Sequence, residues 1–342
     1  MSSRKTPSVS IRPHHSPLNR YVNLFAAAFT TAGWRVRRLR WRPGEAWGSQ
    51  VNIVHWPNDM FSPVGRRRWQ ATGKLLLMRL SRSVFGTRWI WVVHNLQPHD
   101  RGEEGGKIWR AFLGQLDGLV FLSRHSRDQF AAAYPFVRAT SVVVRHGHYR
   151  SGAVRQAGAF APPTADRPLR LQFAGLVRPY KNVDGLIEAT RPLAGLVDLN
   201  IKGLARDPHI RSLLSRLAAG ANNISLHLAS EPLEEAEIED AVDAAHAVIL
   251  PYRHILNSGV ALLSLSRNRP VIAPAVGSLK ELRAEVGPEW VHLYEGELTS
   301  DVLRRAADWV RSVPRRPTSP LHLYDWDRLG PEIVAFAASL RS

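Results

Sequence analysis

The 342-residue sequence has no cysteine and no long apolar run. Without cysteine, the chain cannot form disulfides, ligate zinc through thiolates or use a cysteine nucleophile. A spanning helix needs roughly 18 apolar residues, and residues 1–13 carry basic side chains but no apolar signal-peptide core. These absences predict an unexported protein that does not span a membrane, and they fit a cytoplasmic location.

Acidic residues are scarce in the first half of the chain. Residues 1–160 hold 25 Lys and Arg against 7 Asp and Glu, a net charge of +18, whereas residues 161–342 hold 21 against 22. Eight of the 11 tryptophans also lie in the first half. Basic residues interleaved with tryptophan suit an anionic bilayer surface or nucleic acid, and a solvated basic face is a third interpretation.

Strand and helix patterns alternate along the whole chain. Expected strands cover residues 9–11, 34–39, 51–57, 89–93, 118–122 and 141–144, and then 169–174, 199–202, 224–228, 247–250, 270–273 and 291–294. Expected helices cover residues 20–32, 65–84, 108–116, 123–134, 183–190, 207–219, 234–245, 260–265, 301–310 and 331–340.

This alternation predicts an α/β protein with two doubly wound, Rossmann-like domains facing a cleft. A Pro-rich stretch at residues 152–168 is the expected linker. The expected domains are a basic, tryptophan-rich, Rossmann-like domain at residues 1–160 and a second Rossmann-like domain at residues 161–314. A tail and helix at residues 315–342 are expected to pack back across the domains.

Residues 250–274 read as the end of a strand, a polar loop, a helix and the next strand. Ser258 can cap this helix, and Gly259 leaves its first backbone N–H groups open to close approach. Free N–H groups at a helix start favour a phosphate. The alternative interpretation is an ordinary αβ unit in which Ser258 serves as a cap only.

A second loop, residues 173–182, follows another expected strand and carries Arg178 and Lys181. Two cations at the carboxyl edge of a sheet could neutralise a diphosphate leaving group, while the bland interpretation is a basic turn. Together, the two loops in one domain favour a sugar-nucleotide site.

Polar groups also follow strands in the first domain. His94, His99 and Asp100 follow one strand, Asp59 follows another, and His146 and His148 follow a third. Ligands bind at such strand ends in open α/β sheets. Zinc binding by the histidines is conceivable, but no ligand of another type stands near them in sequence. Histidines that hydrogen-bond in the cleft are the preferred interpretation.

Residues 65–84 read as a basic amphipathic helix. Its first part contains the residues expected to contact a membrane: Arg66, Arg67, Arg68, Trp69 and Lys74. The alternative is a crossover helix with a solvated basic face.

Seven segments, in order across nearly the whole chain, resemble one known family. They are VHWP (residues 54–57), HNLQPHDRG (94–102), HGHYR (146–150), GLVRPYKNVDGL (175–186), LPYRHILNSG (250–259), RPVIAP (269–274) and EVGPEWVHLYEGE (285–297). The chain resembles the GT-B glycosyltransferases, and among them the bacterial family 94 mannosyltransferases of xanthan-type exopolysaccharide assembly.

This resemblance implies transfer of mannose from GDP-mannose, with inversion to a β-1,4 bond, onto a polyprenyl-diphosphate-linked oligosaccharide at the inner membrane face. It favours Asp100 as the base, with His94 and Asp59 as other catalytic candidates. It also implies that the domain at residues 1–160 faces the acceptor and the membrane and that the domain at residues 161–314 binds the nucleotide sugar. Trp56, His99, His146 and His148 are acceptor-side or cleft candidates. The expected donor-binding residues are Gly175, Arg178, Lys181, Tyr252, Ser258, Gly259 and Glu281.

The sequence departs from family patterns at several positions. Asn58 stands where an acidic residue is expected, and Asn182 replaces a glycine. Ile255 and Leu263 occupy the positions of the two glutamates of the large retaining family 4, so a retaining mechanism of that type is disfavoured. The pattern Asp325-Trp326-Asp327 lacks the βα setting of a metal site, and we expect no metal or other cofactor.

Two alternatives stay open. A GT-B transferase could use another sugar nucleotide or linkage, because a few loop groups read the sugar's hydroxyls. A nucleic-acid-binding protein would instead use the basic first half and show steeply salt-dependent binding to DNA. The neutral second domain and its two phosphate-type loops have no role in that account, so we expect no nucleic-acid partner.

Overall fold

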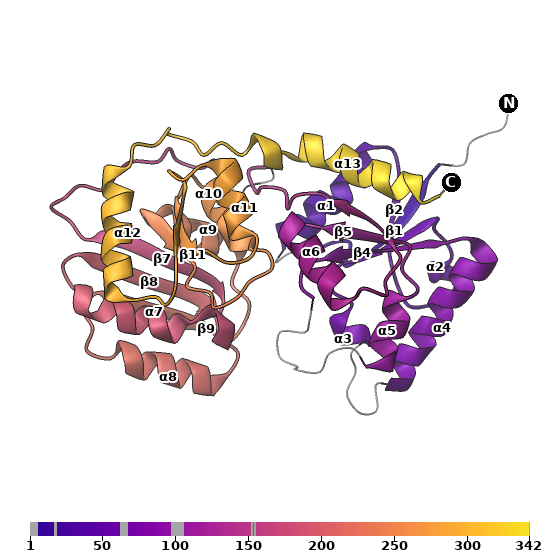
Figure 1. Ribbon diagram of the computed structural model, residues 1–342, viewed down its shortest axis with the longest axis horizontal. Coiled ribbons are helices and arrows are strands. Elements are labelled where there is room, and N and C mark those ends of the chain that lie inside the picture. Colours follow the sequence, from indigo (N-terminus) through magenta and orange to yellow (C-terminus); the bar gives the residue numbers. More distant parts are fainter. Residues whose placement is uncertain are drawn as a thin grey trace. The chain divides into compact units, whose positions relative to one another are not determined.

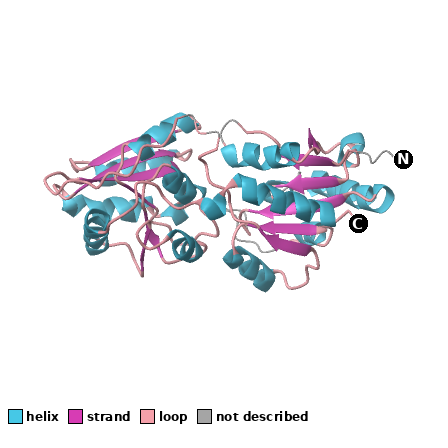
Figure 2. Ribbon diagram, turned by 90° about the horizontal axis from the view of Figure 1, so that it is seen from above, coloured by secondary structure: helices cyan, strands magenta, loops and turns pink. Residues whose placement is uncertain are grey.

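The computed structural model describes residues 6–16, 19–61, 68–96, 106–151, 153 and 155–341. The chain forms two compact units. Unit 1 combines Met1–Gly147 with Tyr324–Ser342, and unit 2 is His148–Leu323. Figure 2 shows the strands of each unit as a central layer flanked by helices.

Unit 1 contains a six-stranded parallel sheet in the order β2-β1-β3-β4-β5-β6. Its strands are β1 (Ser8–Arg12), β2 (Arg35–Arg38), β3 (Val51–Val54), β4 (Arg88–Val93), β5 (Gly118–Phe121) and β6 (Thr140–Val143). The helices in its first chain segment, which ends at Gly147, are α1 (Arg20–Thr31), α2 (Pro43–Ala46), α3 (Asn58–Phe61), α4 (Arg68–Phe85), α5 (Lys107–Leu113) and α6 (Arg124–Ala133).

Unit 2 contains a second six-stranded parallel sheet, in the order β12-β11-β10-β7-β8-β9. Its strands are β7 (Leu169–Leu176), β8 (Val197–Leu204), β9 (Ile224–Ala229), β10 (Ala247–Ile249), β11 (Val271–Pro274) and β12 (Val291–Tyr294). Its α-helices are α7 (Val183–Thr190), α8 (Pro208–Ala218), α9 (Glu235–Asp243), α10 (Gly259–Ser266), α11 (Leu279–Val286) and α12 (Ser300–Ser312). The two doubly wound sheets confirm the predicted fold class.

The last helix, α13 (Trp326–Ser339), belongs to unit 1 and packs beside α1 (Figure 1). The helix and the residue that follows it, Leu340, pack closely against glycines of the first chain segment. A Cβ on Gly118 would lie 2.6 Å from Leu340, and one on Gly147 would lie 2.3 Å from the Trp326 ring. Residues separated by most of the chain therefore complete one core. The helix begins five residues before the expected start at Pro331 and continues through this proline.

The crossing between the units falls after Gly147, upstream of the boundary expected at residue 160. The following residues are held by unit 2. The Tyr149 N–H donates to Ser266 Oγ (2.9 Å), and the Arg150 guanidinium donates to Asn268 Oδ1 (3.0 Å) and to the Ser319 carbonyl (2.8 Å). Part of the segment expected to be a linker is likewise tied down, since the Asn268 amide donates to the Gly158 carbonyl.

Tryptophans in unit 1 serve the core more than the surface. Trp89 and Trp91 are fully buried, and Trp109 and Trp34 are nearly so. Trp41 stacks on Trp89 with the ring centroids 5.4 Å apart. Trp41, Trp47 and Trp56 are half-buried, and Trp69 on α4 is 71% exposed. Most of the described tryptophans of the basic first half therefore pack inside unit 1.

Within the ranges that the structure describes, no helix combines the length and the apolar character that crossing a bilayer requires.

Candidate active site

In unit 2, the order of the strands reverses between β7 and β10. These neighbouring strands pair in parallel, with Val248 in register with Gln172. From β7 the chain continues to β8 and β9 at one edge of the sheet, and from β10 it continues to β11 and β12 at the other edge. Ligands of open α/β sheets bind at the carboxyl ends of the strands beside such a switch point. The loops that follow β7 and β10, at residues 177–182 and 250–258, carry the predicted donor-binding residues.

Lys181 is the most unusual residue at this edge. It is 7% exposed, and its ammonium lies 5.0 Å from the centroid of the Tyr252 ring and 6.0 Å from that of Phe173. Burial, and secondarily the charge of Arg178, lower the pKa of Lys181 to about 8. The side chain is thus a desolvated cation packed against two aromatic rings. An anionic ligand would stabilise the charged form of such a buried lysine.

Gly175 keeps the neighbouring backbone close to this cation. Its φ of +104° lies outside the range that suits side chains, and a Cβ there would stand 3.9 Å from the Lys181 Nζ and 3.4 Å from Val260. The end of β7, Lys181 and the first turn of α10 therefore meet at one place.

The start of α10 is organised by Ser258, as predicted. The Ser258 hydroxyl accepts a hydrogen bond from the Ala261 N–H (3.2 Å) and bonds to the buried Tyr252 hydroxyl. Burial raises the pKa of Tyr252, so its phenol stays protonated. Gly259 is the first residue of the helix. The first backbone N–H groups of α10 can therefore meet an anion without competition from a side chain at Gly259.

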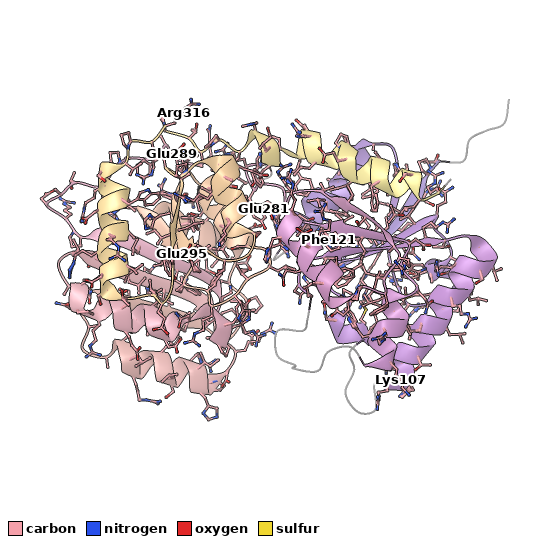
Figure 3. All side chains as sticks on the ribbon, in the orientation of Figure 1. Lys107, Phe121, Glu281, Glu289, Glu295 and Arg316 are labelled. Carbon is pink, nitrogen blue, oxygen red and sulfur yellow. The ribbon has the colours of Figure 1, made fainter. Side chains whose placement is uncertain are left out.

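Arg178 and Glu281 complete the expected donor set. Arg178 immediately precedes the short 3-10 helix Pro179–Lys181, and its charge acts on Lys181. Glu281 is half-buried in the first turn of α11, the helix after β11 (Figure 3). The loop before α11 lies close to the loop after β10, since a Cβ on Gly277 would stand 2.0 Å from the Ile255 carbonyl oxygen.

In unit 1, three histidines that follow strands share one aromatic cluster. His55 follows β3, His94 follows β4 and His146 lies three residues after β6. The ring of Tyr21, from α1, lies with its centroid 5.3 Å from that of His94 and 4.2 Å from that of His146. Trp56 stacks on His94 at 4.5 Å.

The cluster holds its imidazoles neutral. Burial lowers the pKa of His55 to about 3 and that of His146 to about 4, and burial also holds the pKa of His94 well below its usual value. Because these values lie far below 7, none of the three rings carries a proton charge at neutral pH.

The hydrogen bond between His55 and His94 also decides their tautomers. His55 Nδ1 lies 3.0 Å from His94 Nε2, and His55 Nε2 has no partner among the described residues. A buried orphan acceptor is less costly than a buried orphan N–H, so His55 carries its proton on Nδ1 and donates to His94. The proton of His94 is then on Nδ1.

Other predicted residues are placed differently. His148 is the first residue of unit 2 and is buried, so it does not share a unit with His146. His99 and Asp100 lie outside the described residues, as does the side chain of Asp59. Arg66 and Arg67 are also outside them. Arg68 and Trp69 are exposed on α4, but Lys74 is half-buried there.

Sequence reasoning missed His55, Tyr21 and Trp326 as members of the unit 1 cluster. Trp326 reaches it from α13, with its ring centroid 5.6 Å from that of Tyr21. His55 could have been found, because it directly follows a buried strand, as His94 does. Among the described residues, no group of three or more His, Asp and Glu side chains stands close enough to hold a metal ion.

Solved structures share this architecture. Sucrose-phosphate synthase from Thermosynechococcus elongatus matches 98% of this chain and 99% of its own, with a TM-score of 0.67 at 15% identity. The Anabaena protein HepE, solved with UDP-glucose, matches 98% of each chain with a TM-score of 0.60 at 11% identity. With its two doubly wound units, the chain has the GT-B glycosyltransferase fold.

No protein-family model matches the sequence, but curated relatives do. The chain is 37% identical over 282 residues to the GDP-mannose:glycolipid 4-β-D-mannosyltransferase of Xanthomonas campestris pv. campestris, which covers 81% of this chain and 76% of that protein. A second Xanthomonas protein of the same name is 37% identical over 281 residues. The chain belongs to this family of glycosyltransferases, which confirms the resemblance seen in the sequence.

Proposed function

We propose that this glycosyltransferase transfers mannose from GDP-mannose to a lipid-linked oligosaccharide. The donor and the glycolipid acceptor are those named for the 37% identical relatives. The observation that carries the proposal is the buried Lys181 beside the start of α10, because this arrangement suits a diphosphate.

The reaction is an inverting displacement in this proposal. An acceptor hydroxyl oxygen attacks the anomeric carbon from the face opposite the nucleotide. The bond from that carbon to the diphosphate oxygen breaks, its electron pair stays on GDP, and the hydroxyl proton passes to a base. The α-linked donor then yields the β linkage that the names of the relatives specify.

The leaving diphosphate is stabilised by protein groups in place of a metal. Lys181 and Arg178 supply positive charge, and the first N–H groups of α10 supply hydrogen bonds. The Ser258 cap keeps these N–H groups in position by bonding to Ala261 N.

Unit 1 supplies the acceptor side. Asp100 is the proposed base, with Asp59 as the second candidate. His94 is unsuited to that role, because its Nε2 accepts from His55 and its Nδ1 already bears a proton. His94 is instead proposed to orient sugar hydroxyls or the leaving phosphate.

Helix α4 is the proposed membrane-contact surface. Five of the six large apolar side chains exposed among the described residues lie on it: Trp69, Leu76, Leu80, Val84 and Phe85. The first four follow i, i+7, i+11 and i+15, which places them on one stripe, whereas Ala71 and Met78 form the buried face. Exposed Arg68 and Arg79 border this stripe.

An apolar stripe bordered by cations suits the headgroup region of an anionic bilayer. The protein is accordingly proposed to act in the cytoplasm, bound peripherally to the inner face of the plasma membrane. The acceptor is proposed to be a polyprenyl-diphosphate-linked oligosaccharide, whose anionic diphosphate complements the +18 charge of residues 1–160.

A donor panel tests the proposal. Purified protein is incubated with GDP-mannose, GDP-glucose, UDP-glucose or UDP-glucuronic acid and a membrane extract that contains lipid-linked oligosaccharides. We expect sugar transfer to lipid from GDP-mannose, with a β linkage by NMR. Preferred transfer from a UDP-sugar would reject the donor assignment, and an α-linked product would reject inversion.

A further inference from the structure

A polar cavity lies at the amino-terminal edge of the unit 2 sheet. Its volume is about 380 Å³, and its walls include the start of β7, the end of α9 and the residues before β10 and β11. The proposed donor site lies at the opposite, carboxyl-terminal edge of the same strands. The cavity is therefore separate from that site.

Three arginines line this cavity: Arg167, Arg170 and Arg269. Arg170 Nε donates to the Ala244 carbonyl (2.8 Å), and an Arg269 Nη donates to the Asp243 carbonyl (2.8 Å), so both are anchored at the end of α9. No ion pair joins any of the three to a carboxylate among the described residues. Anchored guanidinium groups without carboxylate partners form a preorganised anion site.

Two carboxylates also line the cavity, against three arginines. Asp166 is exposed to solvent, and so are Arg167 and Arg170, whereas Arg269 is half-buried and feels the charge of Asp243. Asp243 is engaged by the buried Arg267, whose Nε donates to its Oδ1 (2.9 Å). A further cation, Arg311, does not line the cavity itself, but its guanidinium donates to the carbonyl of the lining residue Arg167 (3.0 Å).

The positive charge of these arginines acts on His246, which also lines the cavity. Its Nδ1 accepts from the Arg170 N–H (3.0 Å), so its remaining proton lies on Nε2. Burial, followed by the charges of Arg170, Arg269 and Arg311, lowers its pKa to about 4. The cavity thus contains a neutral imidazole N–H donor held among cations.

A second polar pocket of about 250 Å³ adjoins the first, and the two share Arg170 and Ala245. Its walls carry side-chain amides: Gln172, Asn200, Asn222 and Asn223. The amide N–H groups of Gln172, Asn200 and Asn223 already donate to partners within the protein. The exposed Asn222 therefore supplies the amide that is open to a ligand hydroxyl, as donor and as acceptor.

We propose that the arginine-lined cavity binds the phosphate of a small phosphate ester whose hydroxyl-bearing part occupies the amide pocket. This site does not depend on the proposed transferase reaction. Bound phosphate would raise the pKa of His246, since a nearby negative charge favours the imidazolium form.

The test uses full-length protein with labelled histidines, titrated with inorganic phosphate and with glucose 6-phosphate. His246 is assigned by loss of its NMR signal in His246→Asn. We expect both probes to shift this signal and to raise the pKa of His246 by about one unit or more. Glucose 6-phosphate should bind more tightly than phosphate. Equal affinities would remove the amide pocket from the site.

Arg170→Gln and Arg167→Gln should each weaken binding of glucose 6-phosphate about tenfold or more. The matched control is Arg206→Gln, which removes an exposed arginine outside the cavity. GDP binding should stay unchanged in all three variants. An unshifted His246 signal, or an equal loss in the control, would overturn the proposal.

Discussion

His55 Nδ1 and His94 Nε2 share one proton across 3.0 Å, inside a cluster that excludes charge from both rings. The pair makes His94 a donor with a fixed tautomer and orientation. It also makes the stability of unit 1 depend on pH, because the folded cluster resists protonation.

The first prediction concerns this acid sensitivity. The folded-state pKa values of His55 and His146 are about 3 and about 4, below the usual 6.5. The unfolded chain therefore binds protons first as the pH falls, so stability is complete above pH 6.5 and declines below it. Each histidine costs about 1.4 kcal/mol per pH unit between 6.5 and its folded-state pKa.

Urea unfolding at pH 7.5, 6 and 5, followed by tryptophan fluorescence, measures this loss. His146→Gln should lessen the pH dependence, whereas His209→Gln, at an exposed histidine of unit 2, should not. Equal stability at pH 5 and pH 7.5 would contradict the assignment of neutral rings.

The second prediction separates a functional from a structural Lys181. Lys181→Met removes a buried charge whose pKa is lowered from 10.5 to about 8, so the free energy of unfolding should rise by about 1–3 kcal/mol at pH 7. GDP binding should weaken by about 1.5–3 kcal/mol, the range for charge-assisted hydrogen bonds. Calorimetry measures both the free energy of unfolding and the affinity for GDP. A destabilised variant with normal GDP affinity would show that Lys181 is structural.

The same lysine gives a pH profile. It is charged below a pKa of about 8, so GDP affinity should fall as the pH rises through 8 to 9. Lys181→Arg keeps its charge throughout this range and should remove the decline, even if its affinity is lower overall. A wild-type GDP affinity that is flat from pH 7 to 9 would exclude a titrating Lys181 from the site.

The third prediction concerns the start of α10. Gly259→Val places a branched side chain on the first residue of the helix, where it should obstruct a diphosphate and weaken GDP binding by at least tenfold. Ser258→Ala is a useful comparison, since loss of the cap should cost about 1 kcal/mol of stability. A folded Gly259→Val that binds GDP normally would place the diphosphate elsewhere.

The fourth prediction tests α4 with vesicles that contain 30% phosphatidylglycerol or none, in a sedimentation assay at two salt concentrations. Replacing Trp69, Leu76 and Leu80 by serine should reduce binding at both salt concentrations. Replacing Arg66, Arg67 and Arg68 by glutamate should abolish the salt-sensitive part, at about 1 kcal/mol per cation. Leu213→Ser on α8 is the control for an exposed leucine. Unchanged vesicle binding in both variants would place the membrane contact elsewhere. Displacement of the protein from vesicles by duplex DNA would make nucleic acid the partner of the basic residues.

The fifth prediction addresses the base. Asp100→Asn should lower turnover by roughly 10²- to 10⁴-fold while GDP affinity stays normal, because the lost group acts only in the chemical step. Asp59→Asn is the paired variant. Near-normal turnover in Asp100→Asn together with a large loss in Asp59→Asn would transfer the role to Asp59.

Local patterns predicted most of the fold. Helix α7 and strand β12 match their expected bounds, because the turn before each and the apolar pattern within each agree with the tertiary structure. Helix α11 was not expected at residues 279–286. It has no side-chain N-cap hydrogen bond, and its apolar face is short, comprising Leu279, Leu282 and Val286.

The unit 2 loops could be predicted because strand, loop and helix are contiguous in sequence there. The unit 1 cluster could not, since Tyr21, His55, His94 and Trp326 come from segments that only the folded chain brings together. The early start of α13 has the same cause. Packing of Trp326 on Gly147 and of Gly330 on Ala28 outweighs the local preference of Pro331 for a helix start.

The anchoring of Arg150 and Ser319 on Asn268 brings the first and last residues of unit 2 to the same place. In topological terms, unit 2 is an insertion into the chain of unit 1, and its two ends are neighbours. A fragment of residues 148–323 would therefore retain every strand of its sheet and could be excised as a module. Unit 1, by contrast, is assembled from both chain termini and cannot be completed until synthesis reaches α13.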